Sequence, residues 1–470
     1  MKIALMHYHL KPGGVTTVLK QQAAAISESG EVLVITGQPP DSSFPFDTAH
    51  IPGIGYDGEG IDRVDEPRQA ARAVETTIFS KWKNGCDVLH VHNPTLKKNR
   101  NFLVILKQLQ KKGLKLFLQI HDFAEDGRPQ VYFDEAYPAD CHYGVINSRD
   151  EEILRWAGLK KKGLHRIFNT IQFLDLKNRL PQEKPLVLYP IRAIRRKNIG
   201  EAILLSLFFK GREALFITLP PNSPADINPY RRWTDLVKRT DLKVVFEAGL
   251  SEDFPNLVRS AKFMITTSIT EGFGFCFLEP WTADKLLWGR KLPDICRDFE
   301  TSGITLDHLY ENLRVPLAWL GRDIVYEKWA NGVMMSGRHF GLRLDKGKIV
   351  EAFEQITKDQ VIDFGLLDEA FQEKIIARAL SEKKDKQALI QLNPYLVHPG
   401  KISNQKAVIE RNHQAITKAY NRRTYQTTLM KIYARVMTEP VRHRIDKRAL
   451  LNRFFDLKTF SLLKWGSNAV

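Results

Sequence analysis

Residues 261–287 read "AKFMITTSITEGFGFCFLEPWTADKLL" and combine an apolar run, a glycine-rich turn and two carboxylates. The run over 261–269 is mostly apolar and rich in β-branched side chains, which predicts a buried strand. Residues 275–287 fit a helix, with Glu271 in the turn before it and Glu279 about two helical turns later. Such a turn presents backbone N–H groups and the positive end of the helix dipole. It therefore suits an anionic or polyhydroxyl ligand.

The bulk composition is that of a globular protein large enough for more than one domain. The chain has 470 residues, of which 43% are hydrophobic and 26% charged. A single hydrophobic core rarely grows to this size, so we expect two domains. The cysteines, Cys86, Cys141, Cys276 and Cys296, are widely spaced and form no Cys-x-x-Cys pair. This spacing argues against a disulfide framework or a zinc cluster and favours free thiols in a reducing compartment.

The first residues and the net charge indicate the expected location and partners. Residues 1–14, "MKIALMHYHLKPGG", hold a short apolar run interrupted by histidines, which predicts a first strand and not a signal peptide. No apolar run approaches the roughly 20 residues needed to cross a membrane. The formal net charge of +16 and the pI near 9.5 favour acidic partners or an anionic membrane surface. We therefore expect a cytoplasmic protein, either free or peripheral at the inner face of the membrane.

Short apolar runs alternate with amphipathic stretches in two series, which is typical of parallel strands alternating with helices. The connector "RLPQEKP", residues 179–185, separates the series. We therefore expect an α/β protein with an N-terminal Rossmann-like domain over 1–180, a second over 181–435 and a helical segment over 436–470. The predicted strands lie at 2–10, 31–37, 87–93, 114–122, 142–147 and 165–170, and then at 186–191, 214–219, 243–249 and 262–268.

Ligands of open α/β sheets bind at the carboxyl ends of the strands, so the residues that follow each strand are candidate site residues. Gly13 and Gly14 lead directly into a helix, which lets backbone amides approach a phosphate; the alternative is an ordinary tight loop. His121 ends another predicted strand. Residues 192–197, "RAIRRK", follow the first strand of the second series and carry cations suited to a diphosphate. The alternative for this stretch is a solvated charge run.

Together these motifs resemble the retaining glycosyltransferases of family 4. The most specific match is "EGFGFCFLE", residues 271–279, which is similar to the family's Glu-x7-Glu motif with its Gly-Phe-Gly intact. Arg192 and Lys197, five positions apart, match the family's Arg and Lys, and Gly13-Gly14-Val15 matches its glycine turn. The matches occur in order from residue 1 to about 280. The resemblance implies a GT-B fold, in which two facing Rossmann-like domains use a nucleotide-activated sugar.

The resemblance also implies roles for residues of the second domain. Glu279 would accept hydrogen bonds from the ribose hydroxyls of the nucleotide, and Glu271 would contact hydroxyls of the donor sugar. Arg192 and Lys197 would stabilise the charge that grows on the diphosphate as the glycosidic bond breaks. The backbone amides of the turn would approach the donor sugar, and they belong to Gly272, Phe273 and Gly274.

The first domain would complete the reaction. By the same resemblance, His121 would hydrogen-bond the donor sugar, and catalysis would require closure of the cleft between the domains. The acceptor hydroxyl would attack from the leaving-group face, and a diphosphate oxygen would take its proton. The resemblance implies no cofactor besides the donor substrate and no metal, and the chain contains no Asp-x-Asp pattern of metal-dependent transferases. Zinc binding by His90, His92 and His121 is the alternative use of these histidines.

Two segments leave the donor and the partners open. Residues 280–313 are bulkier and longer than the segment that usually follows the second glutamate, so the donor sugar stays open. Residues 97–100, "KKNR", follow a predicted strand and suit an anionic acceptor; a sugar or a lipid-linked molecule would also serve as acceptor. The next helix carries lysines that suit either an anionic membrane or the wet side of an ordinary amphipathic cover helix.

Other functions are compatible with the same fold, or with the same positive net charge. A GT-B sugar phosphorylase or epimerase, or a catalytically silent nucleotide- or glycan-binding module, would share the architecture. Nucleic acid is not an expected partner, because the sequence has no zinc finger, RNP-type strand or helix-turn-helix. Residues 446–465, "DKRALLNRFFDLKTFSLLKW", carry many large apolar side chains that are costly to leave in water. We expect this tail to pack on the first domain, with an anionic membrane as the alternative.

Overall fold

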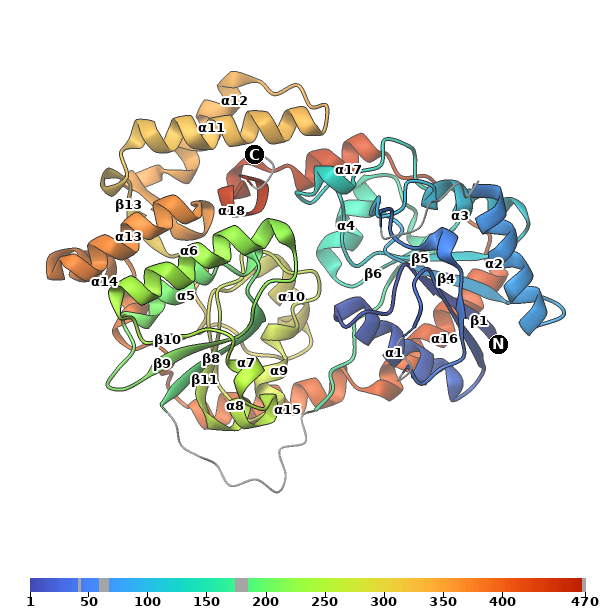
Figure 1. The fold of residues 1–470 in the computed structure, drawn as a ribbon, viewed down its shortest axis with the longest axis horizontal. Coiled ribbons are helices and arrows are strands. Elements are labelled where there is room, and N and C mark those ends of the chain that lie inside the picture. The colour runs from blue at the N-terminus through green and yellow to red at the C-terminus, as the bar shows by residue number, and fades with distance from the viewer. Residues whose placement is uncertain (41–43, 59–66, 174–184, 467–470) are drawn as a thin grey trace. The chain divides into compact units, whose positions relative to one another are not determined.

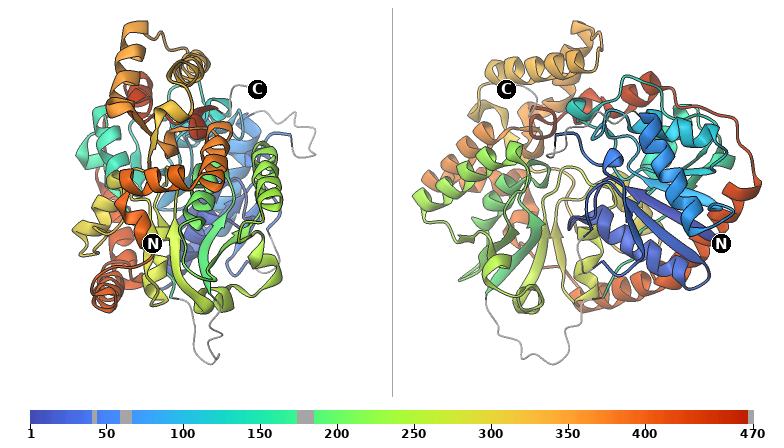
Figure 2. Two further views of the ribbon diagram at one scale, coloured as in Figure 1. Left: turned by 90° about the vertical axis from the view of Figure 1, so that its left-hand side faces the viewer. Right: turned by 45° about the vertical axis from the view of Figure 1, so that its right-hand side comes forward.

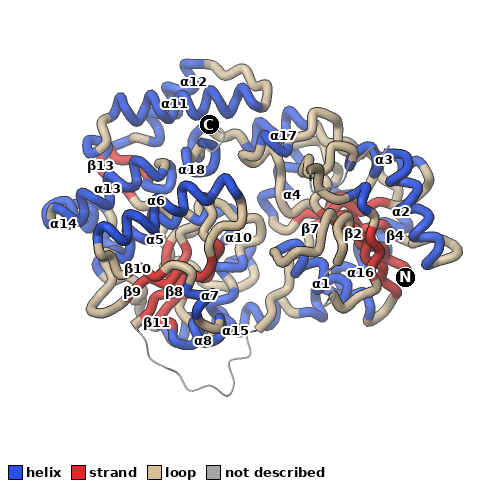
Figure 3. The backbone as a smooth tube through the Cα atoms, in the orientation of Figure 1, coloured by secondary structure: helices blue, strands red, loops and turns tan. Residues whose placement is uncertain are grey.

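The computed structural model describes residues 1–40, 44–58, 67–173 and 185–466. The chain divides into two compact units, each with its own parallel sheet (Figure 1, Figure 3). Unit 1 comprises Met1–Thr170 and Ala419–Phe455, and unit 2 comprises Ile171–Lys418 and Asp456–Val470. The predicted boundary at residue 180 lies outside the described residues.

Unit 1 is built on a seven-stranded sheet with the order β3-β2-β1-β4-β5-β6-β7. All neighbours are parallel, and Met6 of the interior strand β1 pairs with Ile35 on one side and Val91 on the other. Strands in every segment of the first predicted series are confirmed, whereas the three-residue β3 was too short to show a pattern. The strands are β1 (Lys2–His7), β2 (Glu31–Thr36), β3 (Thr48–His50), β4 (Val88–His92), β5 (Leu116–Gln119), β6 (His142–Val145) and β7 (Leu164–Arg166).

Helices cover both faces of this sheet, which explains why its strands read as nearly continuous apolar runs. Side chains alternate along β1: Ala4 and Met6 belong to one core cluster, and Ile3 and Leu5 belong to another. The first cluster includes residues of α2, α3, α4 and α17, and the second includes residues of α1 and α16, which lie side by side (Figure 1). The helices are α1 (Gly14–Ser27), α2 (Pro67–Lys81), α3 (Phe102–Lys111), α4 (Ser148–Trp156), α16 (Arg422–Thr438) and α17 (Lys447–Phe454).

Unit 2 is built on a five-stranded parallel sheet with the order β10-β9-β8-β11-β12, and a two-stranded antiparallel pair lies apart from it. The four strands predicted for this part of the chain are confirmed, and the pattern missed the short β12, β13 and β14. The strands are β8 (Leu186–Arg192), β9 (Ala214–Leu219), β10 (Val244–Val245), β11 (Ala261–Thr266), β12 (Leu287–Gly289), β13 (Arg314–Pro316) and β14 (Val361–Asp363).

The helices of unit 2 flank the five-stranded sheet, and α11 and α12 lie together outside it (Figure 2). Only short elements follow the glycine turn, so the prediction of a helix over 275–287 was wrong. A 3-10 turn covers Phe275–Phe277, and α9 (Glu279–Thr282) follows it. Two residues beyond α9, Asp284 takes a left-handed conformation with φ of 54°. The unit 2 helices are α5 (Ile199–Ser206), α6 (Pro224–Thr240), α7 (Ala248–Ser251), α8 (Phe254–Ser260), α9 (Glu279–Thr282), α10 (Pro293–Thr301), α11 (Arg322–His339), α12 (Lys346–Ile356), α13 (Glu369–Ser381), α14 (Lys383–Leu392), α15 (Gln405–Ala419) and α18 (Leu462–Trp465).

The end of the chain contributes to the cores of both units. Leu450 and Phe454 are buried in unit 1, and Phe460 and Leu462 are buried in unit 2. The chain therefore returns to unit 1 at Ala419 and leaves it again after Phe455. The expected segment was 436–470, so the observed segment begins earlier in the sequence and ends earlier. The earlier entry arises because apolar residues of α16 cover one face of the unit 1 sheet. In the described ranges, no helix has the length and apolar character needed to cross a membrane.

Candidate functional site

The cationic residues after β8 lie in a turn whose backbone is held from two sides. Residues 195–197 form one 3-10 turn, and Asn198 follows in the left-handed conformation with φ of 51°. The hydroxyl of the buried Tyr189 donates to the Lys197 carbonyl at 2.7 Å. On the other side, Nε2 of Gln372 donates to Oδ1 of Asn198 at 2.8 Å. These bonds fix the backbone that presents Lys197 at the carboxyl end of β8.

Lys197 and Arg196 converge on Glu271. Nζ of Lys197 donates to Oε1 of Glu271, and Nη1 of Arg196 donates to Oε2 at 3.1 Å. Only 7% of the Glu271 side chain is exposed. Burial alone would raise the pKa of this carboxyl, but Lys197 and Arg196 outweigh burial and hold the pKa at about 2. Glu271 is therefore ionised at neutral pH, and it joins the turn after β8 to the turn after β11.

The other cations near this turn have different partners. Nη1 of Arg192 donates to the Pro220 carbonyl at 3.0 Å, so Arg192 lies at the same strand end without bonding to Glu271. Arg196 is the contact that the resemblance did not assign. Its only signal in the sequence is its place immediately before Lys197 in a run of cations.

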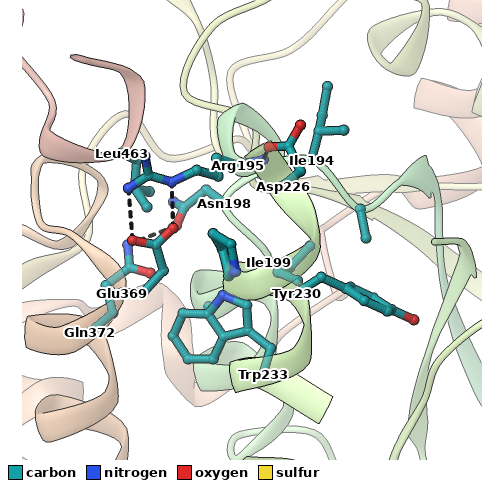
Figure 4. A pocket seen from close by; sticks show the side chains of 13 residues that line it. Ile194, Arg195, Asn198, Ile199, Asp226, Tyr230, Trp233, Glu369, Gln372 and Leu463 are labelled. Carbon is teal, nitrogen blue, oxygen red and sulfur yellow. Dashed lines mark hydrogen bonds and ion pairs between the residues drawn. The ribbon is translucent and has the colours of Figure 1, made fainter. Parts of the chain in front are cut away.

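Arg195 bonds to residues of α13 and α6 rather than to Glu271. Its Nε and Nη2 donate to the two carboxylate oxygens of Glu369 at 2.6 and 2.8 Å, as Figure 4 shows. Its backbone N–H donates to Oδ1 of Asp226 at 3.0 Å. Tyr230 and Trp233 of α6 line the same small pocket (Figure 4). Arg195 was one of the cations considered for a diphosphate; the structure shows it tying the turn to α13.

In the glycine-rich turn after β11, the backbone conformation and the neighbouring side chains require glycine at one position. Gly274 has φ of 91°, and a Cβ there would lie 3.0 Å from side-chain atoms of Ile295 and Phe277. The ring of Phe273 packs against Phe275 and Phe299, with ring centres 5.0 and 5.7 Å apart. The Phe273 side chain therefore belongs to the core, which leaves its backbone amide as the group that a ligand would contact.

Glu279 begins α9 and is exposed. Desolvation by the surrounding residues raises the pKa of its carboxyl, Lys197 lowers it, and Glu271 raises it. The predicted residues Lys197 and Glu271 thus meet at the carboxyl edge of the unit 2 sheet. Residues 272–274 lie in the turn after Glu271, and Glu279 begins the short helix that follows that turn.

His121 lies just after β5 in unit 1, with its backbone and ring fixed. The backbone N–H groups of His121 and Asp122 both donate to Oδ1 of Asn93, at 2.8 and 3.1 Å. Nε2 of His121 lies 2.9 Å from Nδ1 of His92. Burial lowers the pKa of His121 to about 4, and Asp122 opposes this shift. The ring is therefore neutral at neutral pH and suited to hydrogen bonding with hydroxyl groups.

The glycine turn of unit 1 is open. Gly14 is the first residue of α1, and a Cβ built on it would have no heavy atom within 4 Å. A Cβ on Gly13 would lie 3.9 Å from its nearest neighbour, the Lys11 carbonyl oxygen. Packing within the described chain therefore requires glycine at neither position. Both residues are exposed, which leaves the first amides of α1 accessible.

The histidines that the zinc alternative invoked take part in a hydrogen-bonded row. His90 Nε2 lies 2.9 Å from Oε1 of Gln119, and its Nδ1 lies 2.8 Å from the Tyr433 hydroxyl. Burial lowers the pKa of His90 to about 3. Within the part of the chain that the structure describes, no group of three or more His, Cys, Asp or Glu residues is arranged to hold a metal ion.

The sequence is similar to that of a known synthase over part of its length. No family model matches the chain. The mannosylglucosyl-3-phosphoglycerate synthase of Petrotoga mobilis is 26% identical over 353 residues. This alignment covers 63% of the chain and 66% of the relative, which is slightly less than two thirds of the relative's length.

Solved structures are similar over most of the chain. A glycosyltransferase from Rickettsia africae has a TM-score of 0.56 at 10% identity, covering 93% of this chain and 99% of that chain. HepE from Anabaena, in complex with UDP-glucose, has a TM-score of 0.54 at 12% identity, covering 92% and 98%. The sucrose-phosphate synthase of Thermosynechococcus elongatus has a TM-score of 0.53 at 14% identity, covering 92% and 98%. The chain has the GT-B fold.

Proposed function

We propose that this chain is a retaining glycosyltransferase of family 4 that moves a sugar from a nucleotide-diphosphate sugar to an acceptor hydroxyl. The observation that carries the proposal is the pairing of Glu271 with Lys197 and Arg196. It places a carboxylate suited to sugar hydroxyls beside cations suited to a diphosphate, at the carboxyl ends of β8 and β11. The GT-B fold and the similarity to the Petrotoga mobilis synthase support the same class of reaction.

The roles that the resemblance implies agree with the chemistry of each group. Glu279 accepts hydrogen bonds from the two ribose hydroxyls, and Glu271 accepts hydrogen bonds from hydroxyls of the donor sugar. Lys197 has three N–H donors, so it can keep its bond to Glu271 while it donates to a phosphate oxygen. Arg192 must exchange its bond to the Pro220 carbonyl for the diphosphate. The amides of residues 272–274 approach the sugar, and those of Gly13 and Gly14 approach a phosphate.

The reaction proceeds with retention at the anomeric carbon. The acceptor hydroxyl attacks on the face from which the diphosphate leaves, and a diphosphate oxygen takes the acceptor proton. Arg192 and Lys197 stabilise the negative charge that grows on the leaving group, which is the task that a metal performs in other transferases. The neutral His121 hydrogen-bonds the donor sugar. We propose that no metal is required.

The acceptor is proposed from the relative. The name of the Petrotoga mobilis enzyme describes a product that carries a phosphoglycerate group, which is anionic. We propose a small anionic acceptor for this chain, in keeping with its net charge of +16. Contact with an anionic membrane remains a prediction. The apolar side of α3 is buried and Lys112 pairs with Glu75, so this helix is built as a cover helix of unit 1.

Nucleotide binding by paired variants tests the donor site. The full-length protein is titrated with UDP, GDP and ADP, and release of each diphosphate is then followed with a panel of the matching nucleotide sugars. We expect Glu279→Ala to weaken binding of the preferred nucleotide by about 1–3 kcal/mol, because two hydrogen bonds to a diol are lost. Glu327→Ala, which removes an exposed carboxylate on α11, serves as the control. Equal nucleotide affinity in wild type and Glu279→Ala would refute the ribose assignment.

A further inference from the structure

A second pocket lies beside β7, the edge strand of the unit 1 sheet. This β7 pocket has a volume of about 580 Å³, which is within the range of small-molecule binding sites. Residues of β7, α4, α16 and the 3-10 turn Lys161–Gly163 line it, and β7 and α4 lie side by side (Figure 3). All of the lining residues belong to unit 1, so the pocket is formed within one compact unit.

The lining of the β7 pocket is mostly cationic. It holds one carboxylate, that of Glu151, and five cations, which belong to Lys161, Lys162, Arg166, Lys431 and Arg435. Each guanidinium lies near a carboxylate: Nε of Arg166 is 3.6 Å from Oε2 of Glu151, and Nε of Arg435 is 3.3 Å from Oε1 of Glu439. The excess positive charge of the lining therefore comes from the three lysines. A concave surface lined by one sign of charge attracts ions of the opposite sign, so the pocket suits an anion.

Contacts within unit 1 fix the backbone around the β7 pocket. Nη2 of Arg435 donates to the Lys162 carbonyl oxygen at 3.1 Å, which ties α16 to the 3-10 turn. Leu164 and Ile432 are buried and give the lining an apolar part. The segments that carry Lys162 and Lys431 are therefore held in place before a ligand arrives, which lowers the cost of binding.

His165 adds a hydrogen-bond acceptor to this lining. Nε2 of His142 lies 2.8 Å from the Glu439 carbonyl oxygen, which can only accept, so His142 carries its proton on Nε2. Burial lowers the pKa of His142 and lowers that of His165 to about 3, so both rings are neutral at neutral pH. Nδ1 of His142 therefore accepts from Nε2 of His165, 2.8 Å away. Nδ1 of His165 is left as an acceptor, and none of the described residues donates to it.

We propose that the β7 pocket binds a phosphorylated polyol, such as a sugar phosphate, whose phosphate contacts the lysines and whose hydroxyl donates to Nδ1 of His165. Ammonium groups donate charge-assisted hydrogen bonds to phosphate oxygens. A phosphate dianion has no proton to give to His165, whereas a polyol hydroxyl has one. Leu164 and Ile432 can pack against the carbon skeleton of the polyol. The inference does not depend on the proposed function, because none of the residues assigned to the donor lines this pocket.

Calorimetric titration of the full-length protein with glucose 6-phosphate tests the inference. The test variants are Lys162→Gln and Lys431→Gln, and the matched control is Lys111→Gln, which removes an exposed ammonium of α3 in the same unit. We expect binding to be weaker by about tenfold or more in the test variants and unchanged in the control. Lys431→Arg keeps the charge and should retain most of the affinity.

Phosphatidylglycerol vesicles identify the source of the phosphate, because their headgroup also combines a phosphate with hydroxyl groups. Sedimentation with these vesicles is measured for wild type and for the same lysine variants. Binding of glucose 6-phosphate that Lys431→Gln weakens would identify a soluble sugar phosphate. Vesicle binding that Lys431→Gln weakens, without binding of glucose 6-phosphate, would identify a lipid headgroup of the same chemistry.

Methyl phosphate separates the role of His165 from that of the lysines. At about pH 8 it is a dianion without a hydroxyl group, because its second pKa is near 6. We expect wild type to bind glucose 6-phosphate more tightly than methyl phosphate. His165→Phe should weaken glucose 6-phosphate binding by about tenfold and leave methyl phosphate binding unchanged, which also shows that the variant is folded. If His165→Phe does not fold, the preference of wild type between the two esters still decides.

The outcomes separate this inference from the proposed donor site. The inference is wrong if wild type binds neither glucose 6-phosphate nor the vesicles, or if both lysine variants bind as tightly as wild type. It is also wrong if wild type binds methyl phosphate as tightly as glucose 6-phosphate. UDP or GDP affinity should be the same in Lys431→Gln and in wild type, because the nucleotide is assigned to unit 2. Failure of wild type to bind any nucleotide would contradict the proposed function and not the role of the β7 pocket.

Discussion

Nζ of Lys197 donates a hydrogen bond to Oε1 of Glu271, across 74 positions of sequence. The bond joins the ends of β8 and β11, which are neighbours in the unit 2 sheet. Each partner is largely buried, with 14% of the Lys197 side chain and 7% of the Glu271 side chain exposed. The charges that we assign to the donor are therefore held in place before any ligand arrives, which lowers the cost of ordering them on binding.

Replacing the Glu271 carboxylate should destabilise the protein. Glu271→Gln keeps the shape but leaves Lys197 and Arg196 without a negative partner, so we expect a loss of about 1.5–3 kcal/mol in the free energy of unfolding at pH 7. Urea denaturation of wild type and variant measures the loss. The control Glu300→Gln, which breaks the more exposed pair with Lys291, should cost about 0–1 kcal/mol.

The pH dependence of that loss has a definite sign. The pKa of Glu271 in the folded protein is about 2, below its ordinary value of 4.5. The stabilisation is therefore fully present above pH 4.5 and disappears as the pH falls toward 2. The stability difference between wild type and Glu271→Gln should shrink below pH 4.5. A difference that grew with acidification would show that Glu271 is not held ionised by the two cations.

Removing a cation from the proposed donor site should affect turnover more than donor binding. In Arg192→Ala and Lys197→Ala, kcat should fall by a larger factor than the donor KM rises, because the charge on the leaving diphosphate grows in the transition state. Arg231→Ala, on the exposed side of α6, is the control. Steady-state kinetics in the presence of EDTA measure both effects. A change in KM alone would assign these residues to binding only, and loss of activity in EDTA would overturn the metal-free mechanism.

The two glycine turns should respond differently to alanine. Gly274→Ala forces a side chain into a left-handed backbone and against Ile295 and Phe277, so the melting temperature should fall, with a cost of about 1–2 kcal/mol from the backbone alone. Gly14→Ala adds a methyl group where no atom lies within 4 Å, so it should leave the melting temperature unchanged and weaken ligand binding. Calorimetric scans and nucleotide titrations separate the two effects. Equal melting temperatures for the two variants would contradict this account of Gly274.

Truncation after Thr438 should destabilise the protein. It removes Leu450 and Phe454 from the core of unit 1 and Phe460 and Trp465 from the core of unit 2. Each large apolar side chain contributes about 1.5–3 kcal/mol when fully buried. Circular dichroism and thermal unfolding of the truncated chain measure the effect. A truncated enzyme that stays folded and active but no longer sediments with anionic vesicles would show that the tail is a membrane anchor.

Local patterns predicted the strands well because helices cover both faces of each sheet. Residues 2–7 and 88–92 are almost wholly buried, and such runs are visible without tertiary information. The strand at 287–289 was hidden because three residues carry no period, and the left-handed Asp284 that follows the preceding helical turn has no distinctive sequence signal. The helix at 422–438 belongs to unit 1, whereas the residues before Ala419 belong to unit 2, and its own sequence does not specify which sheet it covers.

Individual contacts in the candidate site could not be predicted from the sequence. Glu271 and Glu279 were expected after a strand, and both follow β11, but their role as ligand-binding residues stays a prediction. Arg195, Arg196 and Lys197 are adjacent cations, yet one pairs with Glu369 and two pair with Glu271. The direction of each side chain depends on the 3-10 turn and on the position of α13, which local sequence does not specify.

The anomeric configuration of the product tests the central claim most directly. Wild type is incubated in EDTA with the nucleotide sugar that it consumes fastest and with a phosphorylated acceptor, and proton NMR follows the reaction. The account predicts release of the nucleotide diphosphate together with a new glycoside that has the same anomeric configuration as the donor. A product of inverted configuration, or a sugar 1-phosphate formed only when inorganic phosphate is added, would contradict it.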